Sequence, residues 1–127
     1  MSTDDIVAIQ QLVARYNMAI DDGVGDEFAS TFTDDGELVI PETTISGRDA
    51  LTGFGGSAKE RPIRIRHWVN SQEVTVSGDQ ATARSNLMVL RVGGEGPAML
   101  LTGRYADELR RTDAGWRFTR RVFTPDK

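Results

Sequence analysis

The stretch IRIRHWVNSQEVTV, residues 63–76, decides how this chain folds. Its first half alternates between apolar and polar side chains, the two-residue period of a β-strand with one buried face. A run of fourteen residues is longer than a usual strand, so we expect it to bend, bulge or coil. Alternation divides the side chains between an inner face, with Ile63, Ile65, His67 and Val69, and an outer face, with Arg64, Arg66, Trp68 and Asn70.

The same two-residue period continues to the end of the chain. It predicts further strands over residues 81–92, 98–111 and 116–124, joined by glycine-containing turns at 77–79, 93–96 and 113–115. Successive strands with such short connections pair antiparallel. The second half of the chain therefore predicts a curved antiparallel sheet.

The first half of the chain predicts helices instead. Apolar side chains recur at three- and four-residue spacing from Ile6 to Ile20, behind a cap at Thr3 or Asp4, and Gly23 ends this helix. Shorter helices are expected over residues 26–32 and 48–54, with a turn at 34–36 and a strand at 37–40 between them. Helices followed by a strand meander are typical of an α+β fold, in which the helices cover one face of the sheet.

The composition narrows the class of protein. A length of 127 residues, with 39% hydrophobic and 27% charged side chains, fits a single globular domain over residues 1–127. The chain has no cysteine, which excludes disulfides, thiolate metal sites and cysteine nucleophiles. The sequence has neither the pattern of a signal peptide nor an apolar run long enough for a membrane span. We therefore expect a cytoplasmic protein without a membrane partner.

The net charge of −4 is distributed unevenly. Residues 1–60 carry twelve acidic and three basic side chains, whereas residues 61–127 carry seven acidic and twelve basic ones. The arginines of the second half are scattered along strands, without the lysine clusters and interleaved aromatic residues of a nucleic-acid-binding surface. We expect acidic helices on a basic sheet and no nucleic-acid partner.

His67 is the only histidine, and it shares the inner face with apolar side chains. Imidazole is the side chain whose ordinary pKa lies nearest to neutral, which suits a general base in an apolar cavity. The alternative is a structural histidine bonded to the backbone.

Asp21 and Tyr16 are candidate partners of this histidine. A carboxylate at the C-terminal end of a helix, as expected for Asp21, is unfavourable to the helix dipole unless it has a partner. Tyr16 lies about 140° around the helix from Asp21, so the two converge if the helix unwinds at Asp21. The alternatives are a solvated aspartate and a core tyrosine.

Two arginines compete for the inner face of the last strand. Alternation places Arg120 on the face of Trp116 and Phe118, and Arg121 reaches that face only through a bulge. An inward guanidinium would stabilise a developing oxyanion, whereas an outward one would belong to a solvated edge.

Six short motifs complete the pattern. They are YNMAID at 16–21, FTDDG at 32–36, GR at 47–48, HWVN at 67–70, GRYAD at 103–107, and GWRF followed by an arginine at 115–121. Together they resemble the SnoaL-like branch of the NTF2-like superfamily over about residues 6–123, nearest to scytalone dehydratase and bile acid 7α-dehydratase. The resemblance implies an NTF2-like cone, with N-terminal helices packed on a strongly curved antiparallel sheet that encloses one pocket.

The same resemblance implies a function. It suggests a cofactor-independent lyase or isomerase of the dehydratase type, without a metal, acting on a small apolar cyclic substrate such as a steroid or polyketide. A binding protein without catalysis and a SnoaL-type polyketide cyclase are the alternatives. The implied catalytic residues are Tyr16, Asp21, His67 and Arg121, and the expected substrate contacts are Val39, Phe54, Met88, Leu101 and Tyr105. Trp68 among arginines on the outer face predicts a homo-oligomer, either a dimer or a trimer.

Overall fold

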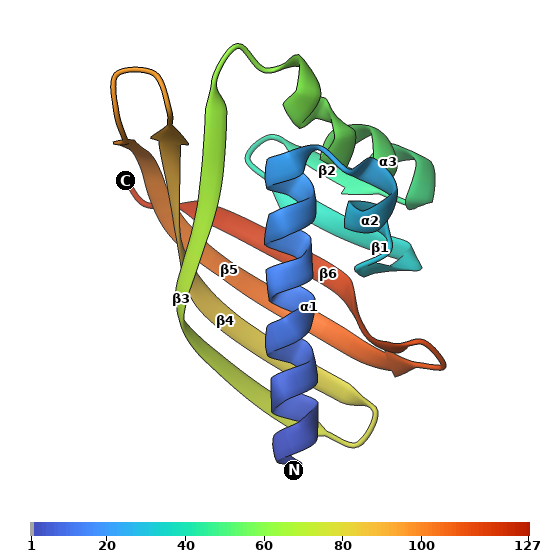
Figure 1. Cartoon of the computed structure of the whole chain (residues 1–127). Helices are drawn as coiled ribbons and strands as arrows, with labels where there is room; N and C mark the ends of the chain where they lie inside the picture. Colours follow the sequence, from blue (N-terminus) through green and yellow to red (C-terminus); the bar gives the residue numbers. More distant parts are fainter. Residues whose placement is uncertain (1) are drawn as a thin grey trace.

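Helices and one six-stranded sheet make up the computed structural model, which describes residues 2–127 (Figure 1). The first half of the chain forms α1 (Thr3–Asp22), α2 (Gly25–Ala29), β1 (Phe32–Ile40), β2 (Thr43–Ser46), α3 (Arg48–Gly56) and a 3-10 helix (Ser57–Glu60). The second half forms β3 (Arg64–Ser77), β4 (Gln80–Val92), β5 (Ala98–Thr112) and β6 (Gly115–Pro125). Among residues 2–127, no helix is both long enough and apolar enough to cross a membrane.

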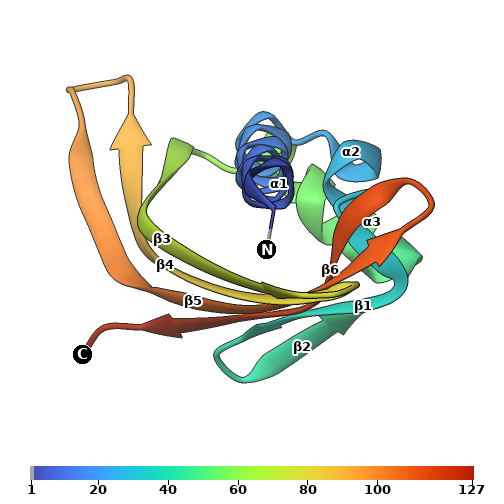
Figure 2. The ribbon, with the colours of Figure 1, turned by 90° about the horizontal axis from the view of Figure 1, so that it is seen from below.

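The sheet is mixed and open, with strand order β2-β1-β6-β5-β4-β3. Strands β3 to β6 form the antiparallel meander that the sequence predicts. Beside the predicted antiparallel strands the sheet has one parallel pair, β1 with β6. This parallel pairing is possible because the whole meander connects the two strands, whereas short connections permit only antiparallel neighbours. Figure 2 shows the sheet curving around α1.

Bulges help the long strands to curve. The register of β3 against β4 shifts between Asn70 and Glu73, where Ser71 has a left-handed φ of 52°. A second shift, between Glu108 and Leu109 of β5, lies opposite Thr119 of β6. An extra residue at a bulge bends its strand and increases its twist. The sheet can therefore wrap around α1 and leave a concave inner face.

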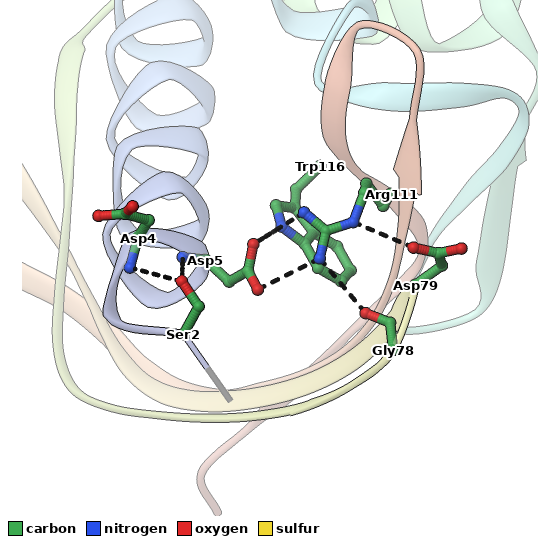
Figure 3. A network of polar contacts seen from close by, with 7 residues as sticks. All are labelled: Ser2, Asp4, Asp5, Gly78, Asp79, Arg111 and Trp116. Carbon is green, nitrogen blue, oxygen red and sulfur yellow. Dashed lines mark hydrogen bonds and ion pairs between the residues drawn. The ribbon is translucent and has the colours of Figure 1, made fainter.

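The first turn of α1 is bound firmly to the sheet (Figure 3). Asp5 accepts hydrogen bonds from Arg111 Nη1 at 2.8 Å and from Trp116 Nε1 at 3.2 Å. Arg111 Nε also donates to Asp79 Oδ1 at 3.1 Å, which adds the β3–β4 turn to the network. The hydrogen bonds from Arg111 and Trp116 lower the pKa of the Asp5 carboxyl. This network fixes one end of the helix, and the candidate site lies at the other.

The termini of α1 match the sequence prediction at one end only. Ser2 is the N-cap, since its hydroxyl accepts hydrogen bonds from the N–H groups of Asp4 and Asp5, so the predicted caps Thr3 and Asp4 are wrong. The extended backbone of Ser2 provides the geometry of a cap, whereas Thr3 is already helical. Gly23 ends the helix in the left-handed conformation, as predicted.

The connection between α1 and β3 departs further from the prediction. The second helix ends at Ala29 instead of residue 32, and the predicted turn at residues 34–36 lies inside β1. The β1–β6 register shifts between Phe32 and Glu37, so this acidic segment is an irregular part of a strand and not a chain reversal. Strand β2 was not predicted, because its four residues pair only with β1 and are mostly exposed.

An aromatic cluster between α1 and the sheet forms the centre of the core. The ring centroids of its neighbouring members lie 4.8 to 6.1 Å apart. All of its side chains are buried, and they come from α1, α2, β1, β5 and β6: Tyr16, Phe28, Phe32, Tyr105 and Phe118. Two of these rings, those of Tyr16 and Tyr105, also line a cavity next to the cluster.

Candidate functional site

A cavity of about 190 Å³ lies between α1 and the concave face of the sheet. Three of its lining residues, Tyr16, His67 and Tyr105, carry polar side-chain atoms. The other lining residues are apolar: Ile20, Leu38, Ile40, Phe54, Ile65, Leu87, Val89, Leu101 and Phe123. A larger groove of about 590 Å³ lies on the convex face beside Trp68 and Met88. We place the candidate site in the smaller cavity because it contains the only histidine.

His67 and Asp21 are in direct contact at the wall of this cavity. Nδ1 of His67 lies 2.6 Å from Oδ1 of Asp21, and the main-chain N–H of His67 donates to both carboxylate oxygens at 3.2 Å. Only 11% of the histidine side chain and 5% of the aspartate side chain are exposed. The helix continues through Asp22, so the expected unwinding at Asp21 does not occur. Instead, β3 brings His67 to the intact end of α1.

This contact selects one tautomer of the imidazole. An ionised carboxylate only accepts hydrogen bonds, so Nδ1 of a neutral His67 carries the ring proton and donates it to Asp21. Nε2 then keeps its lone pair and is the ring atom available to act as a base. The same contact satisfies a carboxylate at the unfavourable end of the helix dipole.

Two phenols share the cavity with the histidine. The rings of Tyr16 and Tyr105 meet edge to face, with centroids 6.1 Å apart. Burial raises the pKa of Tyr16 well above its usual value, and burial also raises the pKa of Tyr105. Both hydroxyls therefore stay protonated near neutral pH and can donate hydrogen bonds.

Arg121 lies behind these tyrosines and does not line the cavity. The register shift opposite Thr119 turns Arg121 into the core, whereas Arg120 points outward and donates to Glu37 at 2.9 Å. Arg121 is fully buried, and its Nε lies 3.0 Å from Oδ1 of Asp107. Burial alone lowers the pKa of Arg121, but Asp107 and the two tyrosines raise it above its usual value. The guanidinium thus remains charged within the core.

The expected substrate contacts divide between the two faces of the sheet. Phe54, Leu101 and Tyr105 lie in the cavity wall. Val39 and Met88 do not line this cavity. Side chains alternate along a strand, so the neighbours of Val39 and Met88 point into the cavity instead. These neighbours are Leu38 and Ile40 in β1 and Leu87 and Val89 in β4. Met88 itself borders the convex groove. Sequence reasoning also missed Asp107, although its alternation with Tyr105 and Leu109 indicated an inward side chain.

Helices that cover a curved open sheet around one small cavity define a protein of the NTF2-like class. The SnoaL-like domain family matches residues 1–122, and the chain belongs to this family. The predicted SnoaL-like resemblance and the NTF2-like cone are therefore confirmed. The family match extends over the whole cavity-forming part of the chain except Phe123.

Three known proteins illustrate the relationship. An uncharacterised protein of Mycobacterium tuberculosis is 33% identical, over 94% of this chain and 84% of its own. The crystal structure of an NTF2-like protein with a cystatin-like fold from Novosphingobium aromaticivorans is 30% identical, with a TM-score of 0.87 over 94% of this chain and 80% of that chain. A putative scytalone dehydratase from the same organism shares the fold at 23% identity, with a TM-score of 0.80 over 96% and 84% of the two chains.

Proposed function

We propose that this protein is a cofactor-independent lyase or isomerase of the dehydratase type, in which His67 removes a proton from a small apolar cyclic substrate. One observation carries the proposal: the single histidine contacts a buried carboxylate, at 2.6 Å, in the wall of an apolar cavity. A buried carboxylate costs free energy unless it has a partner. An imidazole held by a carboxylate in the wall of an apolar cavity is the arrangement of a general base, which favours catalysis over ligand binding alone.

The geometry supports the following reaction. Nε2 of His67 takes a proton from the carbon next to a carbonyl, the C–H electron pair forms the C=C bond of an enolate, and the charge moves to the carbonyl oxygen. Tyr16 donates a hydrogen bond to that oxygen. Departure of a β-hydroxyl group then gives a conjugated double bond, and the imidazolium returns its proton to the leaving oxygen as water. In an isomerisation the proton returns to a different carbon.

The size of the cavity narrows the substrate class. An apolar cavity of about 150 Å³ accommodates benzene, and pockets for drug-sized ligands span about 300–1,000 Å³. The cavity of about 190 Å³ therefore suits a compound of one or two rings better than a steroid. The apolar lining favours a ring system with a single carbonyl that faces His67 and the tyrosines.

The cytoplasmic location stays a prediction.

Exchange with solvent tests the proton abstraction without knowledge of the natural substrate. One- and two-ring β-hydroxyketones would be incubated with the protein in D₂O. Deuterium at the α-carbon would be followed by NMR, and elimination by the absorbance of the conjugated ketone. We expect a rate in the wild type that falls about 10²–10⁴-fold in His67→Gln. Ligands that bind with equal exchange rates in both proteins would identify a binding protein, and ring closure of a linear polyketone would identify a polyketide cyclase.

A further inference from the structure

Behind the cavity tyrosines lies a buried ion pair that the proposed reaction does not use. Asp107 of β5 and Arg121 of β6 are directly opposite in the strand register, and neither side chain is exposed. Within residues 2–127, none of their charged side-chain atoms has a partner in hydrogen-bond alignment, although Nε and Oδ1 are 3.0 Å apart. A buried pair without aligned hydrogen bonds is a poor source of stability. Its presence in the core therefore needs another explanation.

The guanidinium of Arg121 packs on both cavity tyrosines. Its central carbon lies 3.4 Å from the ring centroid of Tyr105 and 4.4 Å from that of Tyr16. Both tyrosines line the cavity and Arg121 does not, so the two rings separate the positive charge from the ligand space. A planar guanidinium can stack on aromatic rings in a way that an ammonium group cannot. One charge thus contacts the two phenols of the cavity at the same time.

A register shift places this charge in the core and interrupts the regular pairing of β5 with β6. Without the shift opposite Thr119, the alternation from Trp116 and Phe118 would turn Arg120 inward. The bulge exchanges the two arginines and aligns Arg121 with Asp107.

We propose that Asp107 and Arg121 form a positioning unit for Tyr16 and Tyr105. Arg121 orients the two phenols and strengthens them as hydrogen-bond donors toward the oxygen of a ligand, and Asp107 holds the guanidinium in place. A nearby positive charge favours the electron density that develops on a donating phenol oxygen, and a nearby carboxylate opposes it. The use of these donors in catalysis rests on the proposed function, but their positioning can be measured without turnover.

The composition of the chain makes this measurement specific. The protein has two tyrosines, and both line the cavity. Replacing both with 3-fluorotyrosine gives two ¹⁹F NMR resonances, which the variants Tyr16→Phe and Tyr105→Phe assign. Fluorine lowers the pKa of a phenol, so both titrations move to lower pH.

Removing one charge at a time should shift the titrations in opposite directions. Arg121→Met should raise the pKa of both tyrosines, because the charge of Arg121 lowers it. Asp107→Asn should lower the pKa of both, because this carboxylate raises it. Arg120→Met, one residue away on the same strand and exposed, is the matched control and should leave both titrations unchanged.

A structural role alone would give a different result. Loosening of the core would expose the phenols and lower both pKa values toward that of a free tyrosine in Arg121→Met as well as in Asp107→Asn. A decrease in both variants, or the absence of any shift, would overturn the proposal. If a single variant does not fold, the double variant Asp107→Leu with Arg121→Met keeps a neutral core and provides the test. There the pKa of Tyr105 should rise, since Arg121 influences it more strongly than Asp107 does, and an unchanged or lowered value would contradict the positioning unit.

The two proposals fail separately. Suppose that the tyrosine pKa values change in opposite directions in Arg121→Met and Asp107→Asn, and that proton exchange is equal in the wild type and His67→Gln. This result would support the positioning unit and reject the catalytic function. Proton exchange that depends on His67, together with ¹⁹F titrations that do not respond to either charge, would reject the positioning unit alone.

Discussion

Asp21 holds His67 at two points, because its carboxylate accepts hydrogen bonds from both the imidazole Nδ1–H and the main-chain N–H of the histidine. The main-chain bond fixes where the strand passes the helix end, and the ring bond fixes how the imidazole is turned. Neither contact uses Nε2, so this nitrogen keeps its lone pair. The two hydrogen bonds to Asp21 therefore define which ring nitrogen of His67 carries the proton, and this can be measured.

We expect the ring proton of His67 to reside on Nδ1 in the wild type. Because the chain has a single histidine, a ¹⁵N-labelled sample gives one pair of imidazole nitrogen signals. Asp21→Asn should produce a mixture of tautomers, since an amide can either donate or accept at this position. Asp22→Asn is the matched control, because Asp22 is exposed and contacts Arg66 at 3.7 Å instead. A wild-type spectrum dominated by the Nε2–H form would contradict the proposed base.

The buried pair of Asp107 and Arg121 should show strong energetic coupling. Arg121→Met leaves an unpaired carboxylate in the core and should lower the free energy of unfolding by about 3–5 kcal/mol in urea titrations. The double variant with Asp107→Leu should recover most of that loss, because a neutral core of similar volume replaces the pair. If the double variant lost as much stability as Arg121→Met and Asp107→Leu lose together when each is made alone, the two charges would not interact.

Acid should weaken the attachment of α1 to the sheet through Asp5. Hydrogen bonds from Arg111 and Trp116 lower the pKa of Asp5 in the folded state. A lowered folded-state pKa stabilises the protein above the pKa of the unfolded chain, about 3.9, and this stabilisation is lost as the pH falls through the folded-state value. Asp5→Asn should therefore be less stable than the wild type at pH 7, with a difference that shrinks toward pH 2.

The pH dependence would be measured by urea unfolding at a series of pH values. Asp4→Asn is the control, because Asp4 contributes to the same network through its main-chain N–H, which donates to Ser2. A constant difference between the wild type and Asp5→Asn across the whole range would show that the carboxylate does not act through its ionisation.

Local patterns predicted the strands of the meander well. Each of β3 to β6 begins and ends within one residue of its predicted bounds, because alternation, Gly-rich turns and burial on one face all act over a few neighbouring residues. The same alternation predicted the inward direction of His67. The contact of His67 with Asp21 was also predicted, and it forms although the helix does not unwind at Asp21.

Features that depend on distant contacts could not be predicted in this way. The parallel pairing of β1 with β6 requires two segments about eighty positions apart to meet. The choice between Arg120 and Arg121 depends on a register shift against β5, and no residue of β6 alone encodes it. Asp107 lies in a strand with three arginines and one glutamate, so its charge alone does not distinguish it, and its alignment with Arg121 depends on the same register shift.

Trp68 should mediate self-association of the protein. It is 59% exposed and borders the convex groove together with Met88, and exposed aromatic side chains of this kind are enriched in interfaces. We predict a symmetric dimer or trimer at micromolar concentration by light scattering, and a smaller species for Trp68→Glu. Met18→Glu, an equally apolar and exposed position on α1, should leave the assembly unchanged. A monomeric wild type would contradict the prediction.

Two glycines of α3 should respond oppositely to the same substitution. A Cβ atom at Gly55 would lie 2.5 Å from the Cβ atom of Phe28, whereas a Cβ atom at Gly53 would meet nothing within 4 Å. Phe28 is fully buried and packs on Tyr16 at 4.8 Å, so it cannot move aside freely. Gly55→Ala should therefore cost about 1–3 kcal/mol by overpacking, and Gly53→Ala should stabilise the helix by about 0.5–1 kcal/mol. Urea unfolding of both variants checks this, and equal stabilities would mean that α3 does not approach Phe28 closely.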